Sequence, residues 1–146
     1  MNRKTSTVRM AGSLSGCGFT LIELMIALAI VGIIAAIAYP SYTRNVTKSN
    51  RSAAESFMMS LANKEEQYLL DSRQYTATVS DLLAVPTDVS RSYTVTITTV
   101  AAPPSYTITA TPTGGQLSSD TSCGTLTLTQ DGTKGVSGSA GVSSCW

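Results

Sequence analysis

An uninterrupted apolar run occupies residues 19–39, in which Thr20 and Glu23 are the only clearly polar side chains before Tyr39. As a helix, these 21 residues would extend about 31 Å, which is enough to cross a hydrocarbon layer of roughly 30 Å. A carboxylate inside a membrane-spanning helix costs free energy, so Glu23 is a candidate functional residue.

The pattern becomes amphipathic after Pro40, which would remove one backbone hydrogen bond and kink a helix. The apolar stripe has helical spacing and consists of Ala54, Met58, Leu61 and Tyr68. The charged residues assigned to the other faces are Arg44, Lys48, Arg51, Lys64 and Glu65. We expect one long helix from about residue 19 to about residue 70, bent near Pro40, with Gly32 as a second weak point. Its second half should pack one face on a globular head.

The hydrophobic period changes to two in three later segments, where apolar residues alternate with threonine: 93–98, 106–111 and 125–129. This alternation predicts three antiparallel strands with one solvated, threonine-rich face. Residues 71–92 are expected to form a connecting loop that Tyr75, Leu82 and Leu83 anchor on the core. The Gly/Ser-rich tail at 135–144 should be loose unless it is tied down. The sequence therefore predicts an α+β fold.

Charge and composition exclude several function classes. The 146 residues suggest one domain and carry a formal net charge of +1. Arg3, Lys4 and Arg9 precede residue 19 without any acidic residue, so the rest of the chain holds seven basic and nine acidic side chains, a net charge of −2. This overall charge gives no electrostatic reason to expect binding to nucleic acid. The absence of histidine removes Ser-His and Cys-His nucleophile pairs and the commonest metal ligand. We predict no enzyme, no catalytic residue, no metal and no cofactor.

The segment Gly18-Phe19-Thr20-Leu21-Ile22-Glu23 adds a processing signal to this picture. A secretory signal peptide has its cleavage site after the apolar core, whereas the candidate site here, between Gly18 and Phe19, precedes it. Cleavage there would leave the apolar helix on the mature protein. This arrangement resembles the class III signal of type IV prepilins and of the related type II secretion pseudopilins.

The three cysteines divide at this cleavage site. Cys17 would leave with the leader, while Cys123 and Cys145, with 21 residues between them, would remain in the exported part. A disulfide is expected in an oxidising compartment. Two free thiols are the alternative, and a metal site would lack ligands.

A long helix laid across an antiparallel sheet and closed by a C-terminal disulfide loop resembles the type IV pilin fold. The segments that carry a finer resemblance, to the minor pilins named PilE, are 66–75, 123–128 and Cys145-Trp146. The domain boundaries that follow are 1–18 for a removed leader, 19–40 for the transmembrane and filament-core half of the helix, and 41–146 for the head.

The resemblance implies roles for the N-terminal residues. In the family, a membrane peptidase cuts after the glycine, here Gly18, and methylates the new N-terminus, here Phe19. Glu23 would pair with the Phe19 ammonium of its own or a neighbouring chain during assembly, and the helix would loosen between Gly32 and Pro40. The implied partners are other pilin subunits, the prepilin peptidase and the assembly machinery of the inner membrane. The head would face the periplasm before assembly, and the pilus would lie on the cell surface.

We therefore predict a structural subunit of a type IV pilus, of the minor pilin class. A major pilin and a type II secretion pseudopilin are alternatives within the same class. A DNA-binding minor pilin for DNA uptake is an alternative of a different class. The basic residues between 71 and 146 are only Arg73, Arg91 and Lys134, which argues against DNA.

Overall fold

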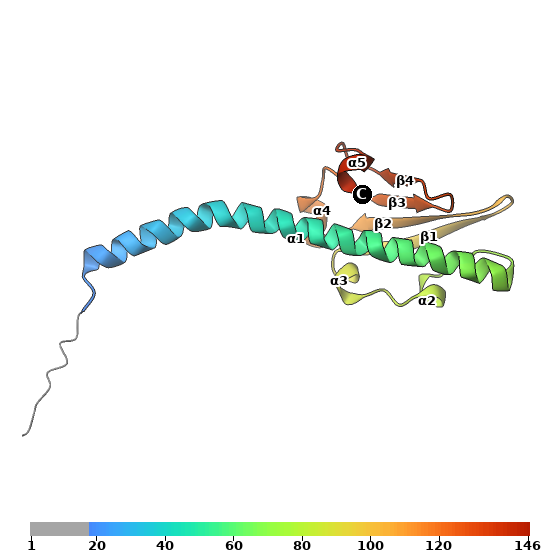
Figure 1. The fold of residues 1–146 in the computed structure, drawn as a ribbon, viewed down its shortest axis with the longest axis horizontal. Coiled ribbons are helices and arrows are strands. Elements are labelled where there is room, and N and C mark those ends of the chain that lie inside the picture. Colours follow the sequence, from blue (N-terminus) through green and yellow to red (C-terminus); the bar gives the residue numbers. More distant parts are fainter. Residues whose placement is uncertain (1–17) are drawn as a thin grey trace, which may run out of the picture. The chain divides into compact units, whose positions relative to one another are not determined.

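The computed structural model describes residues 18–146 (Figure 1). Cys17 and the predicted leader before Gly18 lie outside the described residues. The chain divides into two units, the first ending at Ile37 and the second spanning Ala38–Trp146. Helix α1, Leu21–Ser72, contributes residues to both units and is 52 residues long. The predicted long helix is therefore confirmed, with both ends displaced by about two residues toward the C-terminus.

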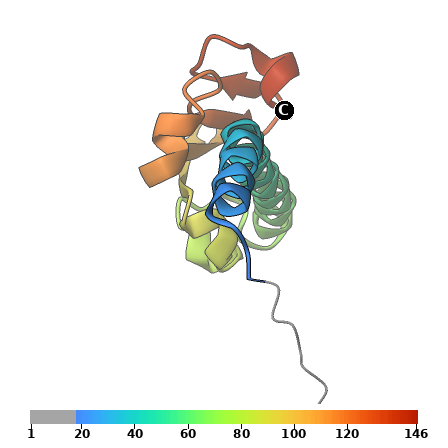
Figure 2. The same ribbon diagram turned by 90° about the vertical axis from the view of Figure 1, so that its left-hand side faces the viewer.

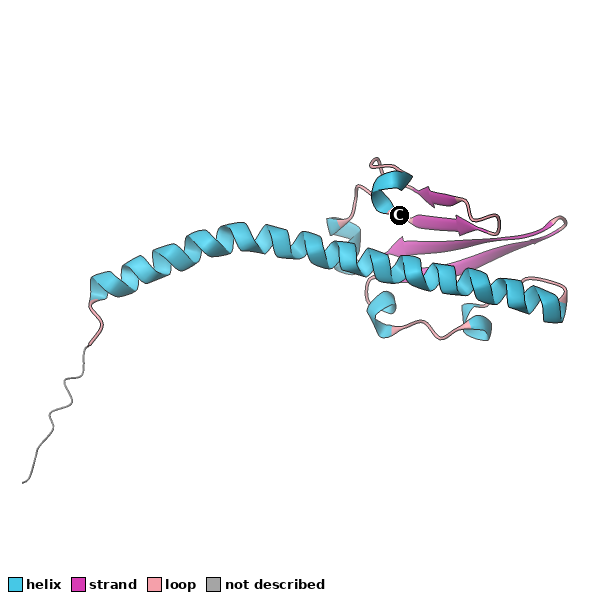
Figure 3. Ribbon diagram, viewed as in Figure 1, coloured by secondary structure: helices cyan, strands magenta, loops and turns pink. Residues whose placement is uncertain are grey.

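The second unit contains one antiparallel sheet with the strand order β1-β2-β3-β4 (Figure 3). The strands are β1 Tyr93–Ala101, β2 Pro104–Pro112, β3 Leu126–Thr129 and β4 Lys134–Val136. The register places Ile97 opposite Ile108 and Ile108 opposite Leu128, so these apolar residues lie on one face of the sheet. The three predicted strands are confirmed. The fourth strand was missed because its three residues are too few to show alternation.

The core of the second unit lies between this face of the sheet and the amphipathic part of α1. The helix contributes Ala54, Phe57, Met58 and Leu61, and the sheet contributes Tyr93, Ile97, Tyr106, Ile108, Ala110, Leu126 and Leu128. Burial of apolar side chains is the main favourable term in folding, worth about 1.5–3 kcal/mol for each large one. The helical stripe and the alternating strands are thus two halves of one core, and the α+β fold with its C-terminal disulfide loop is confirmed.

The connections are more ordered than the sequence suggests. The predicted loop contains two short helices, α2 Val79–Leu82 and α3 Thr87–Ser90, on the opposite side of α1 from β3 and β4 (Figures 1 and 2). Tyr75, Leu82 and Leu83 pack against the core as expected. The prediction of a plain loop at 71–92 is therefore corrected in part. Two further short helices were not expected, α4 Gly114–Ser119 between β2 and β3 and α5 Val142–Cys145 at the end of the tail. Helices of four to six residues are too short to show helical periodicity.

Candidate functional site

The predicted cleavage site lies immediately before α1. Gly18, Phe19 and Thr20 precede the helix and are exposed, with Phe19 at 85%. A Cβ added at Gly18 would meet no atom within 4 Å. Within the described chain, nothing therefore obstructs an approach to the backbone at Gly18. That cleavage occurs there stays a prediction.

Thr20 determines where α1 begins. The Glu23 backbone N–H donates to Thr20 Oγ1 at 3.3 Å, and Leu24 N–H donates to the Thr20 carbonyl at 3.2 Å. These bonds satisfy amides of the first helical turn, which otherwise have no partner. The role of Thr20 was missed from the sequence, although Thr-x-x-Glu before an apolar run is the capping-box signal. Glu23 thus lies in the first turn of the helix.

The apolar part of α1 is exposed along its whole length. Its large side chains from Leu21 to Ile37 are 52–77% exposed. Among the described residues, α1 is the one helix long and apolar enough to cross a membrane, with a mean hydropathy of 2.8 in its most apolar window. Contiguous apolar surface of this extent marks a membrane or protein contact. This surface needs lipid or other chains to cover it.

Two sequence predictions about this helix stay untested. Glu23 is exposed and makes no ion pair within the described residues. Phe19 has a free ammonium only after cleavage, so their pairing stays a prediction. Pro40 lies inside α1, and a Cβ added at Gly32 would meet no atom within 4 Å. The kink or loosening between Gly32 and Pro40 also stays a prediction.

The disulfide expected from the cysteine count is present between Cys123 and Cys145, and both cysteines are buried. The bridge fixes α5 and the C-terminal residue against the sheet. Trp146 Nε1 donates to the Gly135 carbonyl at 3.1 Å, and Lys134 Nζ lies 4.8 Å from the centre of the Trp146 ring. The tail is therefore tied down, which was the condition placed on it from the sequence.

A buried polar network next to this disulfide was not expected. Arg51 had been assigned to a face of the helix other than the apolar stripe, and this is wrong, because it is buried beneath α4 and the segment that follows. Its Nη1 donates to Asp120 Oδ1 and contacts Cys123 Sγ, both at 2.7 Å. Asp120 Oδ2 accepts from Gln116 Nε2 at 3.1 Å and from the Tyr93 hydroxyl at 3.3 Å. Burial raises the pKa of Tyr93 to about 12.

Glu65 is the second charged residue that had been wrongly assigned to a face other than the apolar stripe. Its side chain is fully buried, where Oε2 accepts the Thr76 backbone N–H at 3.1 Å and Oε1 has no hydrogen-bond partner among the described residues. Burial raises the pKa of the Glu65 carboxyl. The carboxyl joins the end of α1 to the loop that follows, where Tyr75 packs edge-on against Tyr106 with ring centres 4.8 Å apart.

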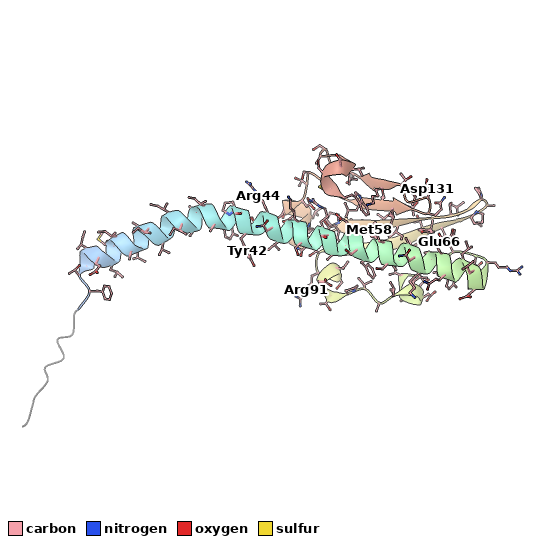
Figure 4. The ribbon with its side chains drawn as sticks, in the orientation of Figure 1. Tyr42, Arg44, Met58, Glu66, Arg91 and Asp131 are labelled. Atoms are coloured by element: carbon pink, nitrogen blue, oxygen red, sulfur yellow. A yellow bond between two sulfur atoms is a disulfide. The ribbon has the colours of Figure 1, made fainter. Side chains whose placement is uncertain are left out.

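The charges of the second unit are mixed in sign. The exposed basic side chains are Arg44, Lys48, Arg73, Arg91 and Lys134, and the exposed acidic ones are Glu66, Asp71, Asp81, Asp88 and Asp131. A cavity of about 290 Å³ lies beside Arg91, where the first turns of α1 after Pro40 meet α4, and its lining includes Tyr42, Val46 and Gln116. Arg91 and Tyr42 lie on the same side of α1, whereas Arg44 lies on the other (Figure 4).

Two family models match the chain. The model described as "Type IV minor pilin ComP, DNA uptake sequence receptor" matches residues 40–127. The model described as "Prokaryotic N-terminal methylation motif" matches residues 16–39, which include the predicted cleavage site. The finer resemblance to the PilE minor pilins stays a prediction.

Curated relatives are pilins and pseudopilins. The chain is 36% identical over 70 residues to the type II secretion system core protein G of Pectobacterium carotovorum subsp. carotovorum, covering 48% of the chain and 45% of that protein. It is 35% identical over 69 residues to the type IV major pilin protein PilA of Myxococcus xanthus, covering 47% of the chain and 31% of that protein. It is 46% identical over 57 residues to the type IV major fimbrial protein FimA of Dichelobacter nodosus, covering 39% of the chain and 36% of that protein. The chain thus spans less than half the length of each of these three relatives.

A solved type IV pilin from Shewanella oneidensis has the same fold. The two structures superpose with a TM-score of 0.52 at 22% sequence identity, covering 68% of this chain and 97% of that one. At this identity the likeness concerns the fold alone. The relatives and the solved structure are structural pilins and pseudopilins, and none of these is an enzyme.

Proposed function

The chain belongs to the family described as type IV minor pilin ComP, DNA uptake sequence receptor, and on this basis we propose that it is a structural subunit of a type IV pilus. We assign it to the minor pilins, as the description of the family model suggests. It would be made as a prepilin, held in the inner membrane with its head in the periplasm, and then polymerised through the N-terminal half of α1.

The observation that carries this proposal is the exposed apolar surface of α1 from Leu21 to Ile37. In the membrane, lipid would cover these side chains. Outside it, the same surface must stay buried because apolar side chains are unfavourable in water. A bundle of identical or related helices in the core of a filament provides that cover, and members of the pilin family assemble in this way.

Processing is the first part of the proposal that can be tested. Cleavage between Gly18 and Phe19, with methylation of the new N-terminus, would remove 18 residues and add one methyl group. Intact-mass measurement on protein from cells with an active prepilin peptidase should give this mass. A mature chain that begins at another residue, or a chain that stays uncut in such cells, would contradict the proposal.

The assembly role of Glu23 is the second part. A carboxylate in lipid is costly, and the Phe19 ammonium of a neighbouring chain would offset that cost as a subunit enters the filament. The variant Glu23→Val should accumulate in the membrane at wild-type levels but enter filaments poorly. Asp88→Asn, which changes an exposed carboxylate on the head, is the matched control and should assemble normally. Equal incorporation of the two variants would argue against the pairing.

A DNA receptor is a second candidate function, and the observation that favours it is the match of residues 40–127 to the ComP family model. Because the charges of the head are mixed in sign and form no strongly basic patch, we expect its binding to DNA to be weak. Binding of the full chain to duplex DNA, measured over a range of salt concentrations, tests this candidate. A receptor should bind particular sequences more tightly than others. Its affinity for DNA should fall steeply as the salt concentration rises, because binding releases counterions.

Cell phenotypes separate the two candidates. Loss of the gene should reduce piliation if the subunit acts in assembly. It should abolish transformation while pili remain if the subunit acts mainly as a DNA receptor. Counting the subunits along isolated pili with a specific antibody separates a minor pilin, which should be sparse, from a major pilin, which should label the whole filament.

A further inference from the structure

Basic side chains lie on two sides of α1 just beyond its apolar half. We name Tyr42, Arg44, Lys48 and Arg91 the neck collar, and all four lie in the second unit and are exposed. In the part of the chain that the structure describes, the side chains of Arg44, Lys48 and Arg91 make no ion pair and no hydrogen bond. Arg44 lies on one side of the helix, and Tyr42 and Arg91 on the other (Figure 4). Arg44 and Lys48 are four residues apart and share a face of α1, so the collar presents positive charge on two sides of the helix rather than along one face.

Few acidic groups oppose this charge. The sequence has no Asp or Glu between Glu23 and Glu55, a stretch that contains Arg44, Lys48 and Arg51. Arg51 lies outside the collar, because Asp120 at 2.7 Å and Glu55 at 3.8 Å already pair with it. The acidic side chain of α3 is Asp88, which lies one turn before Arg91 at the end of that helix. The collar thus keeps a net positive charge.

The collar is also partly apolar. Tyr42 is 68% exposed, and Val46 is partly exposed one turn further along the same helix. Both line the cavity of about 290 Å³ that also includes Arg91. A phenol ring and an aliphatic side chain beside the Arg91 guanidinium form an amphiphilic surface. Tyr is enriched at membrane interfaces, where its ring contacts the acyl boundary and its hydroxyl the headgroups.

Tyr42 and Arg44 follow the apolar run along α1 at about the depth of the headgroup layer, whereas Lys48 lies beyond it. If the apolar run ending at Tyr39 lies in the hydrocarbon, Tyr42 and Arg44 follow at about 4.5 and 7.5 Å along the helix axis, and Lys48 at about 14 Å. The headgroup layer on each side of a bilayer is about 5–7 Å thick. Long basic side chains extend their charged ends toward phosphates from such positions.

We propose that the neck collar binds the phosphates of anionic phospholipids and thereby holds the head of the unassembled subunit at the membrane surface. This inference rests on the proposed membrane anchoring through residues 19–39. Arginine suits the role because its planar guanidinium forms paired hydrogen bonds with phosphate oxygens. Withdrawal of the subunit into a filament would break these contacts, so anionic lipid would favour the unassembled state.

The test uses the full chain in nanodiscs of phosphatidylcholine alone or mixed with an equal part of phosphatidylglycerol. Amide hydrogen exchange is followed in peptides that cover residues 42–50, 87–92 and 114–119. Exchange should be slower in the anionic discs. Each basic residue near an anionic surface contributes a factor of about 5 in binding, so the combined variant Arg44→Gln, Lys48→Gln, Arg91→Gln should lose the effect.

A second variant with the same loss of charge outside the collar, Lys64→Gln, Arg73→Gln, Lys134→Gln, is the matched control and should keep the slower exchange. Equal exchange in both disc types, with the wild type inserted in both, would overturn the inference and leave the membrane anchor intact. Failure of the chain to insert into either disc would contradict the proposed function itself.

Two further arms identify the ligand. If inorganic phosphate in neutral discs gives the same protection, the collar binds free phosphate and the lipid assignment is wrong. If a short duplex protects these peptides in neutral discs and anionic lipid does not, the surface belongs to the DNA candidate instead. Protection by anionic lipid that neither reagent reproduces supports the inference.

Discussion

Removal of the Asp120 carboxylate should destabilise the head strongly. In Asp120→Ala the buried Arg51 guanidinium loses its partner at 2.7 Å, and Gln116 Nε2 and the Tyr93 hydroxyl lose an acceptor. Breaking a buried ion pair from one side costs about 3–5 kcal/mol. We expect the lower end, about 3 kcal/mol, because Glu55 lies 3.8 Å from Arg51 Nε and remains as a second carboxylate. A head of this size has a total stability of about 5–15 kcal/mol.

Urea unfolding of the full chain in detergent, followed by fluorescence, measures this loss. The chain has one tryptophan, Trp146, whose ring lies beside Lys134 in the second unit, so the signal reports on the head. Asp88→Ala removes an exposed carboxylate and should change the free energy of unfolding by less than about 0.5 kcal/mol.

A double-mutant cycle isolates the ion pair. In Arg51→Met, Asp120→Leu both charges are replaced by apolar side chains of similar size, a change that is often neutral or stabilising at buried pairs. We expect this double variant to be more stable than Asp120→Ala. The argument fails if Asp120→Ala unfolds at the wild-type urea midpoint. It also fails if the coupling energy from Arg51→Met, Asp120→Leu and their combination lies within about 0.5 kcal/mol of zero.

Three other variants test separate features. Cys145→Ser opens the loop closed by a bridge between residues 22 positions apart, so it should lower head stability by about 3 kcal/mol and expose the tail to proteases, whereas cleavage of the leader should be unaffected; a wild-type melting temperature would refute this. Burial raises the pKa of Glu65 above its ordinary value of 4.5, so its favourable contribution is complete below pH 4.5 and lost as the pH rises through the folded-state pKa. The stability of the wild type should therefore fall relative to Glu65→Gln between acidic and neutral pH, and parallel stability–pH curves would contradict the shift. Gly138→Ala places a methyl group against the Ser122 carbonyl and should cost about 1–3 kcal/mol by thermal unfolding, while Gly115→Ala, with no atom within 4 Å of its added Cβ, should have a smaller effect.

Local patterns were sufficient for most of the architecture. The apolar run, the stripe through Ala54, Met58 and Leu61, and the alternation at 93–98 and 106–111 each predicted an element that the structure contains. Periodicity works for these segments because each places one continuous face of a helix or strand against the core. Composition also predicted the disulfide, since two cysteines remain beyond the processing signal. The short elements β4 and α2 to α5 carry no such pattern.

Only the tertiary structure decided which polar residues are buried and, among the described residues, which charged side chains have no partner. Arg51 and Glu65 have the helical spacing of the buried stripe, and only their charge had placed them on other faces. In the structure, α4 and the loop after α1 cover them and supply their hydrogen-bond partners. The partner of Arg51 lies 69 residues away along the chain, and no local period can indicate contact over that distance. The neck collar has the same origin, because Arg91 reaches the neighbourhood of Tyr42 only through the fold. The sequence by itself determined the elements and the apolar surface that needs cover, because both follow from neighbours along the chain. The pairing of buried charges and the charge around the neck depend on neighbours in space.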